Sequence, residues 1–244
     1  MATERVTEPS RGPEFIRRNN AGTRWFHAGV YVTVFVLMFT GWWLTLGQEG
    51  SPSVLSELVN VADTELHTVI GWVLAGLVLI GVLFGWRAAR TLLADSVRFR
   101  RSDLRWLTSW PAALFTGRFR RHDGHFDPGQ RIANILIIVL LLALIVSGVG
   151  LDSVSGGPAF VWFREIHLWS TYLFTPVIAG HILIAAGVLP GYRGAWRAMH
   201  LGGRLRVRVA QRLWPGWLER QQGARPAVSS APVADASGGD DESR

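Results

Sequence analysis

Four of the seven histidines in this 244-residue chain lie within or at the ends of long apolar segments. They are His27, His67, His167 and His181. Imidazole nitrogens bind transition metals and transfer protons near neutral pH, and a histidine in an apolar segment usually has such a task. His167 and His181 are 14 residues apart. On a helix this spacing is about 21 Å of rise, with both side chains within about 40° of one face, so a single helix would present two imidazoles at two depths.

The absence of cysteine limits the chemistry further. Thiol catalysis, disulfides and iron–sulfur clusters held by this chain are excluded, so any such cluster must belong to a partner. All 25 basic residues are arginine, and the pI is about 11.2. A basic chain often binds nucleic acid, but arginine-rich loops between apolar segments have a simpler cause in membrane topology. We therefore expect no nucleic-acid partner.

Four apolar runs are each long enough to cross a bilayer, which requires roughly 20 residues. Because backbone polar groups must be paired internally in lipid, these runs predict transmembrane helices. The predicted fold is an all-α membrane protein with a four-helix bundle. Its membrane domain covers residues 25–190, with helices at about 25–46, 66–86, 132–151 and 165–189.

The arginines are distributed unevenly between the two sides of the predicted bundle. Residues 1–24 contain five, the loop 87–131 contains ten, and the chain from Arg193 onward contains nine. The other two loops contain only Arg164. Because positively charged loops remain inside, both termini and the 87–131 loop are predicted to be cytoplasmic. The chain is thus predicted to be a multi-pass protein of the bacterial cytoplasmic membrane.

Four segments lie outside the bundle on its predicted cytoplasmic side. The loop 87–131 and the segment 191–220 combine arginines with tryptophans, which is typical of short helices on an anionic lipid surface. Residues 1–24 form a polar N-terminal segment without the apolar core of a cleavable signal peptide. Residues 221–244 are rich in small and polar residues, which predicts a disordered tail.

The predicted topology sorts the four histidines into two pairs by depth. His67 and His167 lie near the outer ends of their helices, whereas His27 and His181 lie near the inner ends. Each pair comes from two different helices, as is required when two imidazoles bind a haem iron from opposite faces. The sequence therefore predicts a bundle that encloses two b-type haems, one in each leaflet.

Two glycines support this arrangement. Gly41 follows His27 by 14 residues, and Gly81 follows His67 by 14 residues. Each glycine therefore lies on the histidine face of its helix but at the depth of the other haem, where a flat macrocycle needs clearance. Glycine also allows close helix packing, so either role is open for Gly81 alone. The remaining histidines are expected to be solvated or to form a pH-sensitive surface; they are His122, His125 and His200.

Several short motifs carry a resemblance to a known family. They are Arg24-Trp25-Phe26-His27, Thr40-Gly41, His67 with Gly71, Asp127-Pro128-Gly129-Gln130-Arg131, His167, His181 and Gly194-Ala195-Trp196-Arg197-Ala198-Met199. Over about residues 15–200 the chain resembles the cytochrome b (gamma) subunit of membrane-bound formate dehydrogenases. That subunit is related to the cytochrome b of nickel–iron hydrogenases and to bacterial cytochrome b561. The family form of the third-helix motif is Asn-Ala-Gly-Gln-Lys, so this chain departs from it at three positions.

The resemblance implies two b haems with the same histidine pairing, and a quinone site beside the inner haem. Menaquinone or ubiquinone would contact Asp127, Gly129 and Gln130 next to His181. The Asp127 carboxylate would relay a proton, cap the third helix, or do both. Two further side chains, Arg24 and Arg131, would neutralise haem propionates or serve only to set the topology.

The function implied by the resemblance is that of a membrane anchor in a respiratory complex. An iron–sulfur subunit, attached to a molybdopterin-type or hydrogenase catalytic subunit, would deliver electrons that pass through both haems to a quinone. One alternative is a stand-alone cytochrome b561-type quinol oxidase or a hydrogenase-type cytochrome b. Another is a membrane scaffold or transporter without haem. If the chain is a membrane anchor of a respiratory complex, the partner oxidises the substrate, because an anchor of this kind does not select the electron donor.

Overall fold

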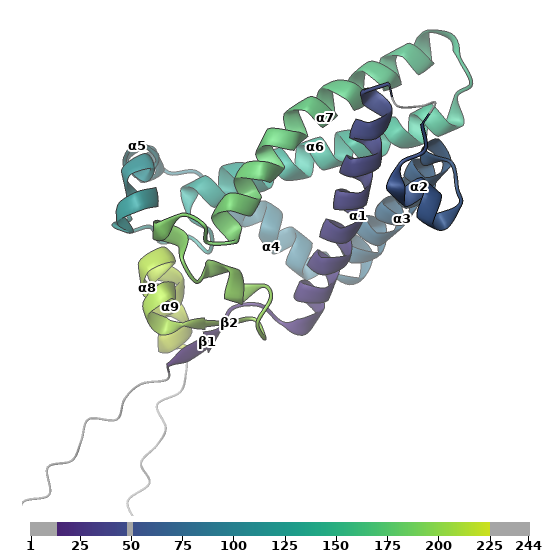
Figure 1. The fold of residues 1–244 in the computed structure, drawn as a ribbon. Coiled ribbons are helices and arrows are strands. Elements are labelled where there is room, and N and C mark those ends of the chain that lie inside the picture. The colour runs from purple at the N-terminus through teal and green to yellow at the C-terminus, as the bar shows by residue number, and fades with distance from the viewer. Residues whose placement is uncertain (1–13, 48–50, 225–244) are drawn as a thin grey trace, which may run out of the picture.

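The computed structural model describes residues 14–47 and 51–224. Most of the chain in these ranges is helical (Figure 1). Residues 225–244 of the predicted tail and the first 13 residues of the N-terminal segment lie outside the described residues, whereas residues 221–223 of that tail are helical and belong to α9. The elements are β1 (Phe15–Arg17), α1 (Ala21–Thr45), α2 (Val54–Val59), α3 (Asp63–Phe84), α4 (Trp86–Ser96), α5 (Arg101–Thr116), α6 (Pro128–Ser153), α7 (Gly157–Ala185), 3-10 turns at Pro190–Tyr192 and Ala195–Ala198, β2 (Arg204–Arg206), α8 (Val207–Leu213) and α9 (Pro215–Gly223).

Four helices of the described ranges, α1, α3, α6 and α7, are long and apolar enough to cross a membrane. This confirms the predicted all-α membrane fold with four spans. The helix bounds differ most at α7, which begins at Gly157 instead of about residue 165. Arg164 and Glu165 interrupt the apolar run, but they remain helical and form an exposed ion pair of 2.8 Å. Pro158, in the first turn, lacks the N–H that has no partner there anyway.

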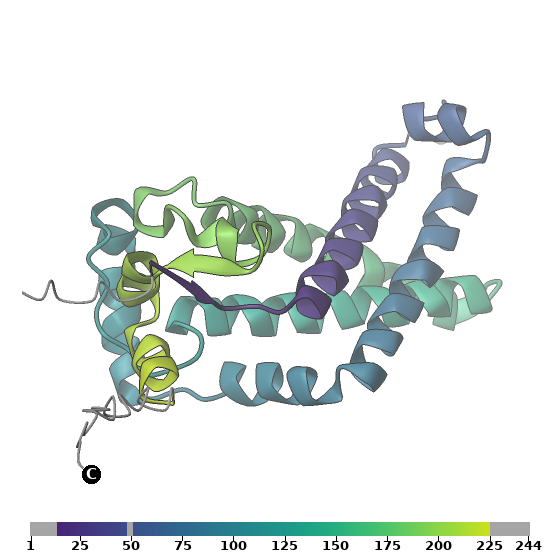
Figure 2. The same ribbon diagram turned by 90° about the horizontal axis from the view of Figure 1, so that it is seen from below.

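The long helices form two antiparallel hairpins, α1 with α3 and α6 with α7 (Figures 1 and 2). The hairpins cross, and α3 packs against α6 where they meet. A small apolar core of Val34, Leu74 and Phe174 fills this crossing. Many other side chains on the four helices are large, apolar and exposed, such as Leu79 and Val139. Such surfaces suit a lipid environment, where apolar groups need no cover.

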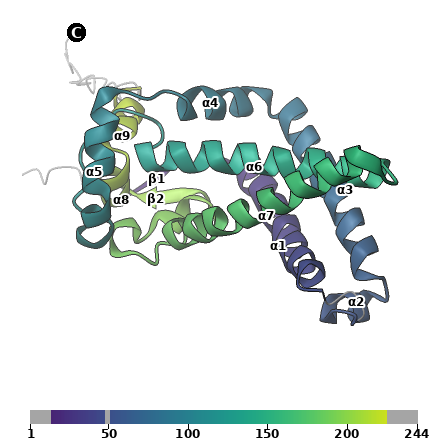
Figure 3. The same cartoon turned by 90° about the horizontal axis from the view of Figure 1, so that it is seen from above.

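The predicted loop 87–131 contains two helices, α4 and α5 (Figure 3). The chain bends at Gly85, and α4 then runs beside α6, joined to it by a hydrogen bond of 3.1 Å from Asn134 Nδ2 to Ser96 Oγ. Helix α6 begins where Asp127 accepts a hydrogen bond of 2.8 Å from the Gln130 amide. Asp127 is therefore an N-cap followed by proline at the first helical position, as its sequence suggested.

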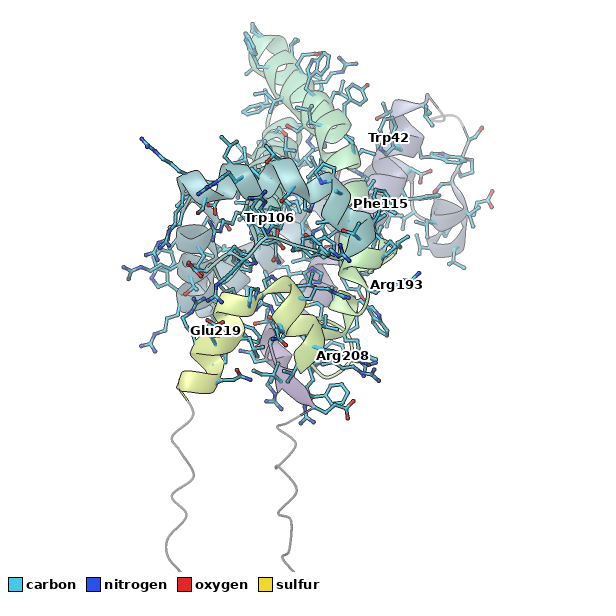
Figure 4. All side chains as sticks on the ribbon, turned by 90° about the vertical axis from the view of Figure 1, so that its left-hand side faces the viewer. Trp42, Trp106, Phe115, Arg193, Arg208 and Glu219 are labelled. Carbon is cyan, nitrogen blue, oxygen red and sulfur yellow. The ribbon has the colours of Figure 1, made fainter. Side chains whose placement is uncertain are left out.

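A compact assembly, here called the cap, covers the end of the bundle where α1 begins and α7 ends. It comprises residues 14–20, 101–127 and 190–224, and Figure 4 looks onto it, with Trp106 on α5, Arg208 on α8 and Glu219 on α9. Strand β1 pairs antiparallel with β2, with Ile16 opposite Leu205. The buried core of the cap is Ile16, Tyr192, Ala198, Leu205, Ala210, Leu213, Trp214, Trp217 and Leu218. We call the end that the cap covers the arginine-rich end.

The tryptophans of the cap differ from the sequence-based prediction. Trp106, Trp214 and Trp217 are between 2% and 5% exposed, so these rings pack within the cap and are not available to lipid. The guanidinium carbon of Arg18 lies 4.0 Å from the ring centre of Trp214 and 4.5 Å from that of Trp217. Arg18 Nη2 also donates a hydrogen bond of 2.6 Å to the His125 carbonyl. Trp214 and Trp217 thus form cation–π contacts with an arginine from the other end of the described chain.

Removing Arg18 should loosen the cap without affecting the long helices. We expect Arg18→Ala to lower the stability of the cap by about 2 kcal/mol, because a buried cation–π contact and a charged hydrogen bond are lost together. Burial lowers the pKa of Arg18 to about 9, so the side chain is still charged at neutral pH. Hydrogen exchange of the β1 and β2 amides measures the effect. Arg17→Ala, at the neighbouring exposed position, is the control; equal exchange in both variants would contradict this account.

Candidate functional site

His67 and His167 face each other across the two hairpins. Their ring centres are 6.2 Å apart, with an angle of 79° between the ring planes. His67 lies in the second turn of α3 and His167 in the third turn of α7. Both line a cavity of about 370 Å³ whose wall is formed by all four long helices. The structure therefore brings together the first pair of histidines predicted from the sequence.

The cavity wall is mostly apolar and is interrupted by glycines. Gly41, Gly71 and Gly148 all line it. A Cβ atom on Gly41 would lie 3.1 Å from His67 Cε1, and one on Gly148 would lie 3.4 Å from His167 Cε1. A side chain at Gly41 would press against the His67 imidazole, whereas a Cβ atom at Gly148 would make ordinary van der Waals contact with His167. Gly41 lies at the depth of this pair, where the sequence analysis expected it.

Two buried hydroxyl groups hold the imidazoles of this pair. Thr40 Oγ1 lies 2.8 Å from His67 Nδ1, and Ser147 Oγ lies 3.0 Å from His167 Nδ1. Both hydroxyl residues are at most 1% exposed. Sequence reasoning assigned them no role. The available signal was the hydroxyl–glycine dipeptide, Thr40-Gly41 and Ser147-Gly148, which occurs within two of the apolar runs.

His27 and His181 form the second pair, at the arginine-rich end. Their ring centres are 6.4 Å apart, with an angle of 51° between the planes. The ring of Tyr31 makes edge contacts with His27 at 5.7 Å and with His200 at 6.0 Å. His27 Nδ1 is buried and has no hydrogen-bond partner within the described ranges. Thus α7 contributes one histidine to each pair, as its 14-residue spacing predicted.

Both separations fit a metal ion held between two imidazoles. With metal–nitrogen bonds of about 2.0 Å, and about 1.1 Å from nitrogen to ring centre, two opposed imidazoles have centres about 6.2 Å apart. The observed values are 6.2 Å and 6.4 Å. Within residues 14–47 and 51–224, no group of three His, Cys, Asp or Glu side chains could hold a metal by itself. Two protein ligands per site suit a metal whose other positions are filled by a macrocycle.

The second predicted glycine has a different surrounding. At Gly81 the ring of Phe26 occupies the position that a side chain would take. Gly81 therefore accommodates a neighbouring aromatic ring, which corresponds to the helix-packing role left open for it in the sequence. The clearance expected there for the inner macrocycle is filled by Phe26.

The two predicted propionate partners lie in different places. Arg131 forms a buried ion pair with Asp103, with 2.8 Å between Nη1 and Oδ2, and it donates to the Arg98 carbonyl at 2.6 Å. Arg131 therefore joins α6 to α5, and its guanidinium is already paired within the protein. Arg24 lies one turn before His27, and its Nη1 donates to the His200 carbonyl at 3.5 Å. Of the two arginines, Arg24 is the one near a histidine pair.

The predicted quinone residues lie together beneath the cap. Asp127 is 2% exposed and accepts a hydrogen bond of 3.5 Å from the Tyr192 hydroxyl. Gln130 Oε1 accepts one of 3.3 Å from Trp214 Nε1. A Cβ atom on Gly129 would lie 3.3 Å from the Trp106 ring. No hydrogen bond or ring contact within the described part of the chain joins these residues to His181, which belongs to the second histidine pair.

The electrostatics under the cap favour neutral groups. Burial raises the pKa of Asp127, and burial together with that carboxylate also raises the pKa of Tyr192. His122, expected to be solvated, is only 6% exposed, and its Nε2 donates to the Leu213 carbonyl at 2.8 Å. Burial lowers the pKa of His122, and it lowers the pKa of His125 to about 4. The prediction of a solvated His122 was wrong because the 190–224 segment folds over it. His200 is exposed, as expected.

The fold and the paired imidazoles define a class, the membrane cytochromes b, in which apolar helices hold haem between histidines. A family model described as prokaryotic cytochrome b561 matches residues 18–202, which is about three quarters of the chain. The chain belongs to this family. No curated protein sequence matches it significantly. It is therefore a multi-pass bacterial membrane cytochrome that binds b haem and transfers electrons.

The protonation of Asp127 gives a test of the cap. Because burial raises its pKa in the folded protein above the ordinary value of 3.8, its stabilising contribution is complete below pH 3.8 and is lost as pH rises through the folded pKa. Asp127→Asn keeps an N-cap acceptor and cannot ionise. We expect its melting temperature to exceed that of the wild type at pH 8 and to equal it near pH 4.

The charged neighbours of Asp127 oppose this effect, since Arg18 and His122 both lower its pKa. The matched variant Asp127→Ala also cannot ionise but loses the N-cap acceptor, so it should be about 1 kcal/mol less stable than Asp127→Asn at both pH values. An Asp127→Asn protein that melts lower than the wild type at pH 8 would show that the carboxylate is ionised and net stabilising under the cap.

Proposed function

We propose that this protein is a dihaem cytochrome b that carries electrons across the membrane to a quinone. The observation that supports this most directly is the presence of two imidazole pairs, with ring centres 6.2 Å and 6.4 Å apart, each formed by histidines from two different helices. The haem ligands would be His67 with His167 at one site, and His27 with His181 at the other. Because α7 contributes to both sites, the two haems would lie on one continuous path.

The residues of this chain bind and shield the cofactor. Four histidine nitrogens would hold the two irons, and the apolar wall formed by Val34, Leu144 and Phe174 would exclude water from the first site. Gly41 would leave room for the flat ring beside His67. A bound b haem supplies a one-electron centre whose potential is set by axial ligands, hydrogen bonds and burial.

We infer the orientation from the arginines. Residues 1–24, the stretch 87–131 and the chain from Arg193 onward contain 24 of the 25 arginines, and positively charged segments remain in the cytoplasm. On this basis the termini and the cap are cytoplasmic, and the His67–His167 site is the outer one. Electrons moving from the outer to the inner site would do work against a membrane potential that is negative inside, about 2.3 kcal/mol per charge per 100 mV.

The quinone part of the proposal rests on the resemblance to formate dehydrogenase gamma subunits. Asp127, Gly129 and Gln130 correspond to the motif that accompanies a quinone site there. A buried Asp127 with a raised pKa retains its proton to a higher pH, which suits a group that passes protons to a reduced quinone. Menaquinone and ubiquinone both fit this chemistry.

The proposed electron donor is an iron–sulfur subunit of a formate dehydrogenase-type complex, attached to a molybdopterin-type catalytic subunit. The chain has no cysteine, so such clusters must lie in a partner. The family match describes cytochrome b561 in general, which also favours a second candidate, a stand-alone quinol oxidase or a hydrogenase-type cytochrome b. In that case a soluble acceptor, oxygen or a hydrogenase would replace the formate dehydrogenase partner.

Single histidine substitutions test the assignment of ligands. His167→Ala should remove one haem per chain and leave the other with an unchanged spectrum, because each haem needs both of its imidazoles. His67→Ala should remove the same haem as His167→Ala, whereas His27→Ala should remove the other. Haem content per chain and the split of the reduced α band measure this outcome.

His125→Ala is the matched control, because His125 is half-buried in the cap and belongs to neither pair. It should retain two haems per chain. Loss of both haems from a folded His167→Ala protein would contradict the pairing, and a wild-type protein with one haem per chain would contradict the dihaem proposal.

Purification in a mild detergent from the native membrane tests the partner. A formate dehydrogenase-type anchor should copurify with a subunit that shows iron–sulfur EPR signals and whose substrate reduces the haems of this chain. If the isolated cytochrome alone is reduced by quinol and reoxidised by a soluble acceptor at full rate, the stand-alone candidate is correct.

A further inference from the structure

Each hairpin presents a buried hydroxyl group, followed by glycine, to a histidine of the same site. Thr40 on α1 contacts His67 on α3, and Ser147 on α6 contacts His167 on α7. The two hydroxyl residues are 107 positions apart in the chain and lie on different hairpins, yet they reach the two facing imidazoles of one pair. The site is therefore supported in the same way from both sides.

The direction of these hydrogen bonds follows from the helix backbone. Thr40 Oγ1 lies 2.9 Å from the Val36 carbonyl, and Ser147 Oγ lies 2.6 Å from the Ala143 carbonyl. A hydroxyl has one hydrogen and a carbonyl can only accept, so each hydroxyl donates to its own helix. Its oxygen is left to accept the N–H of the imidazole Nδ1. Both histidines are then neutral tautomers with Nε2 free to bind a metal.

The second pair lacks this support. Within the part of the chain that the structure describes, His27 Nδ1 has no hydrogen-bond partner, and its near neighbours are the rings of Tyr31 and His181. The guanidinium of Arg24 lies at the same end of α1 and adds a positive charge. The two sites therefore differ in both hydrogen bonding and local charge.

We propose that Thr40 and Ser147 are positioning residues that fix the tautomer and orientation of His67 and His167 and thereby make this haem the lower-potential one of the two. The inference rests on the proposed function, in which both pairs hold haem. An imidazole that donates its N–H to an acceptor is a more basic ligand and stabilises the ferric state. Positive charge near the other site stabilises the ferrous state. Electrons would then pass downhill from the His67–His167 site to the His27–His181 site.

The test is a redox titration of Thr40→Val and Ser147→Ala in the haem-loaded protein, followed optically and by EPR. Each variant should shift the lower of the two midpoint potentials upward. The expected change in the oxidation equilibrium is roughly three- to tenfold, where tenfold corresponds to about 59 mV for one electron. The higher potential should stay constant. His167→Ala identifies which of the two transitions belongs to this site.

Matched variants separate the hydroxyl effect from a packing effect. Thr33 on α1 makes the same bonds to its own helix, at 3.0 Å to the Gly29 carbonyl and 2.9 Å to the Val30 carbonyl, and within the described residues it has no hydrogen bond to a histidine. Thr33→Val should change neither potential. The conservative variants Thr40→Ser and Ser147→Thr keep the hydroxyl and should restore wild-type behaviour.

The outcomes are distinguishable from failure of the proposed function. If the wild type does not bind two haems, the proposed function fails. If the wild type does bind two haems, three results would contradict only the present inference. Thr40→Val could leave both potentials unchanged, as Thr33→Val should, or it could shift the potential of the other haem. The third such result is a His67–His167 haem with the higher of the two potentials. Should Thr40→Val and Ser147→Ala lose this haem altogether, retention of it at the wild-type potential in Thr40→Ser and Ser147→Thr would support the inference. Loss in those variants too would overturn it.

Discussion

The interaction on which the structure depends is the pairing of imidazoles across two crossed helical hairpins. A histidine in an apolar segment is costly unless it binds something, so its position fixes where helices must meet. In α7 the 14-residue spacing of His167 and His181 gives one helix a place in both pairs. The partner histidines, His27 and His67, both lie near the N-terminal ends of α1 and α3, so these helices must be antiparallel for the two pairs to lie at different depths. The crossing of the hairpins and the cavity between them follow from this requirement.

The two ends of the bundle solve different physical problems. At the end where α3 and α7 begin, buried hydroxyls and glycines shape a largely apolar cavity around His67 and His167. At the arginine-rich end, the cap buries charged groups and offsets their desolvation with partners, as in the ion pair of Arg131 with Asp103 and the stacking of Arg18 between two indole rings. One end is therefore built around an apolar cavity, whereas the other, which holds the His27–His181 pair, is covered by a cap that joins the two ends of the described chain.

Sequence alone predicted the features that depend on the length of the apolar runs and on the positions of the histidines within them. Four helices and two histidine pairs followed from apolar runs of about 20 residues and from depth in the membrane. Tertiary contacts decided the remainder. Hydropathy could not show that Arg164 and Glu165 continue α7, that Trp214 and Trp217 stack on Arg18 instead of contacting lipid, or that Phe26 fills the space at Gly81. Thr40 and Ser147 were missed because a hydroxyl in an apolar helix commonly bonds only to its own backbone.

The central claim is that the chain holds two haems, each between two histidines. EPR of the oxidised protein tests this most directly, since ferric haem with two imidazole ligands is low-spin and its anisotropy depends on the angle between the ligand planes. The planes are at 79° in one pair and 51° in the other. The account therefore predicts two distinct low-spin signals of equal intensity and no high-spin signal. A single low-spin signal, or a high-spin signal from a haem with one open position, would contradict it.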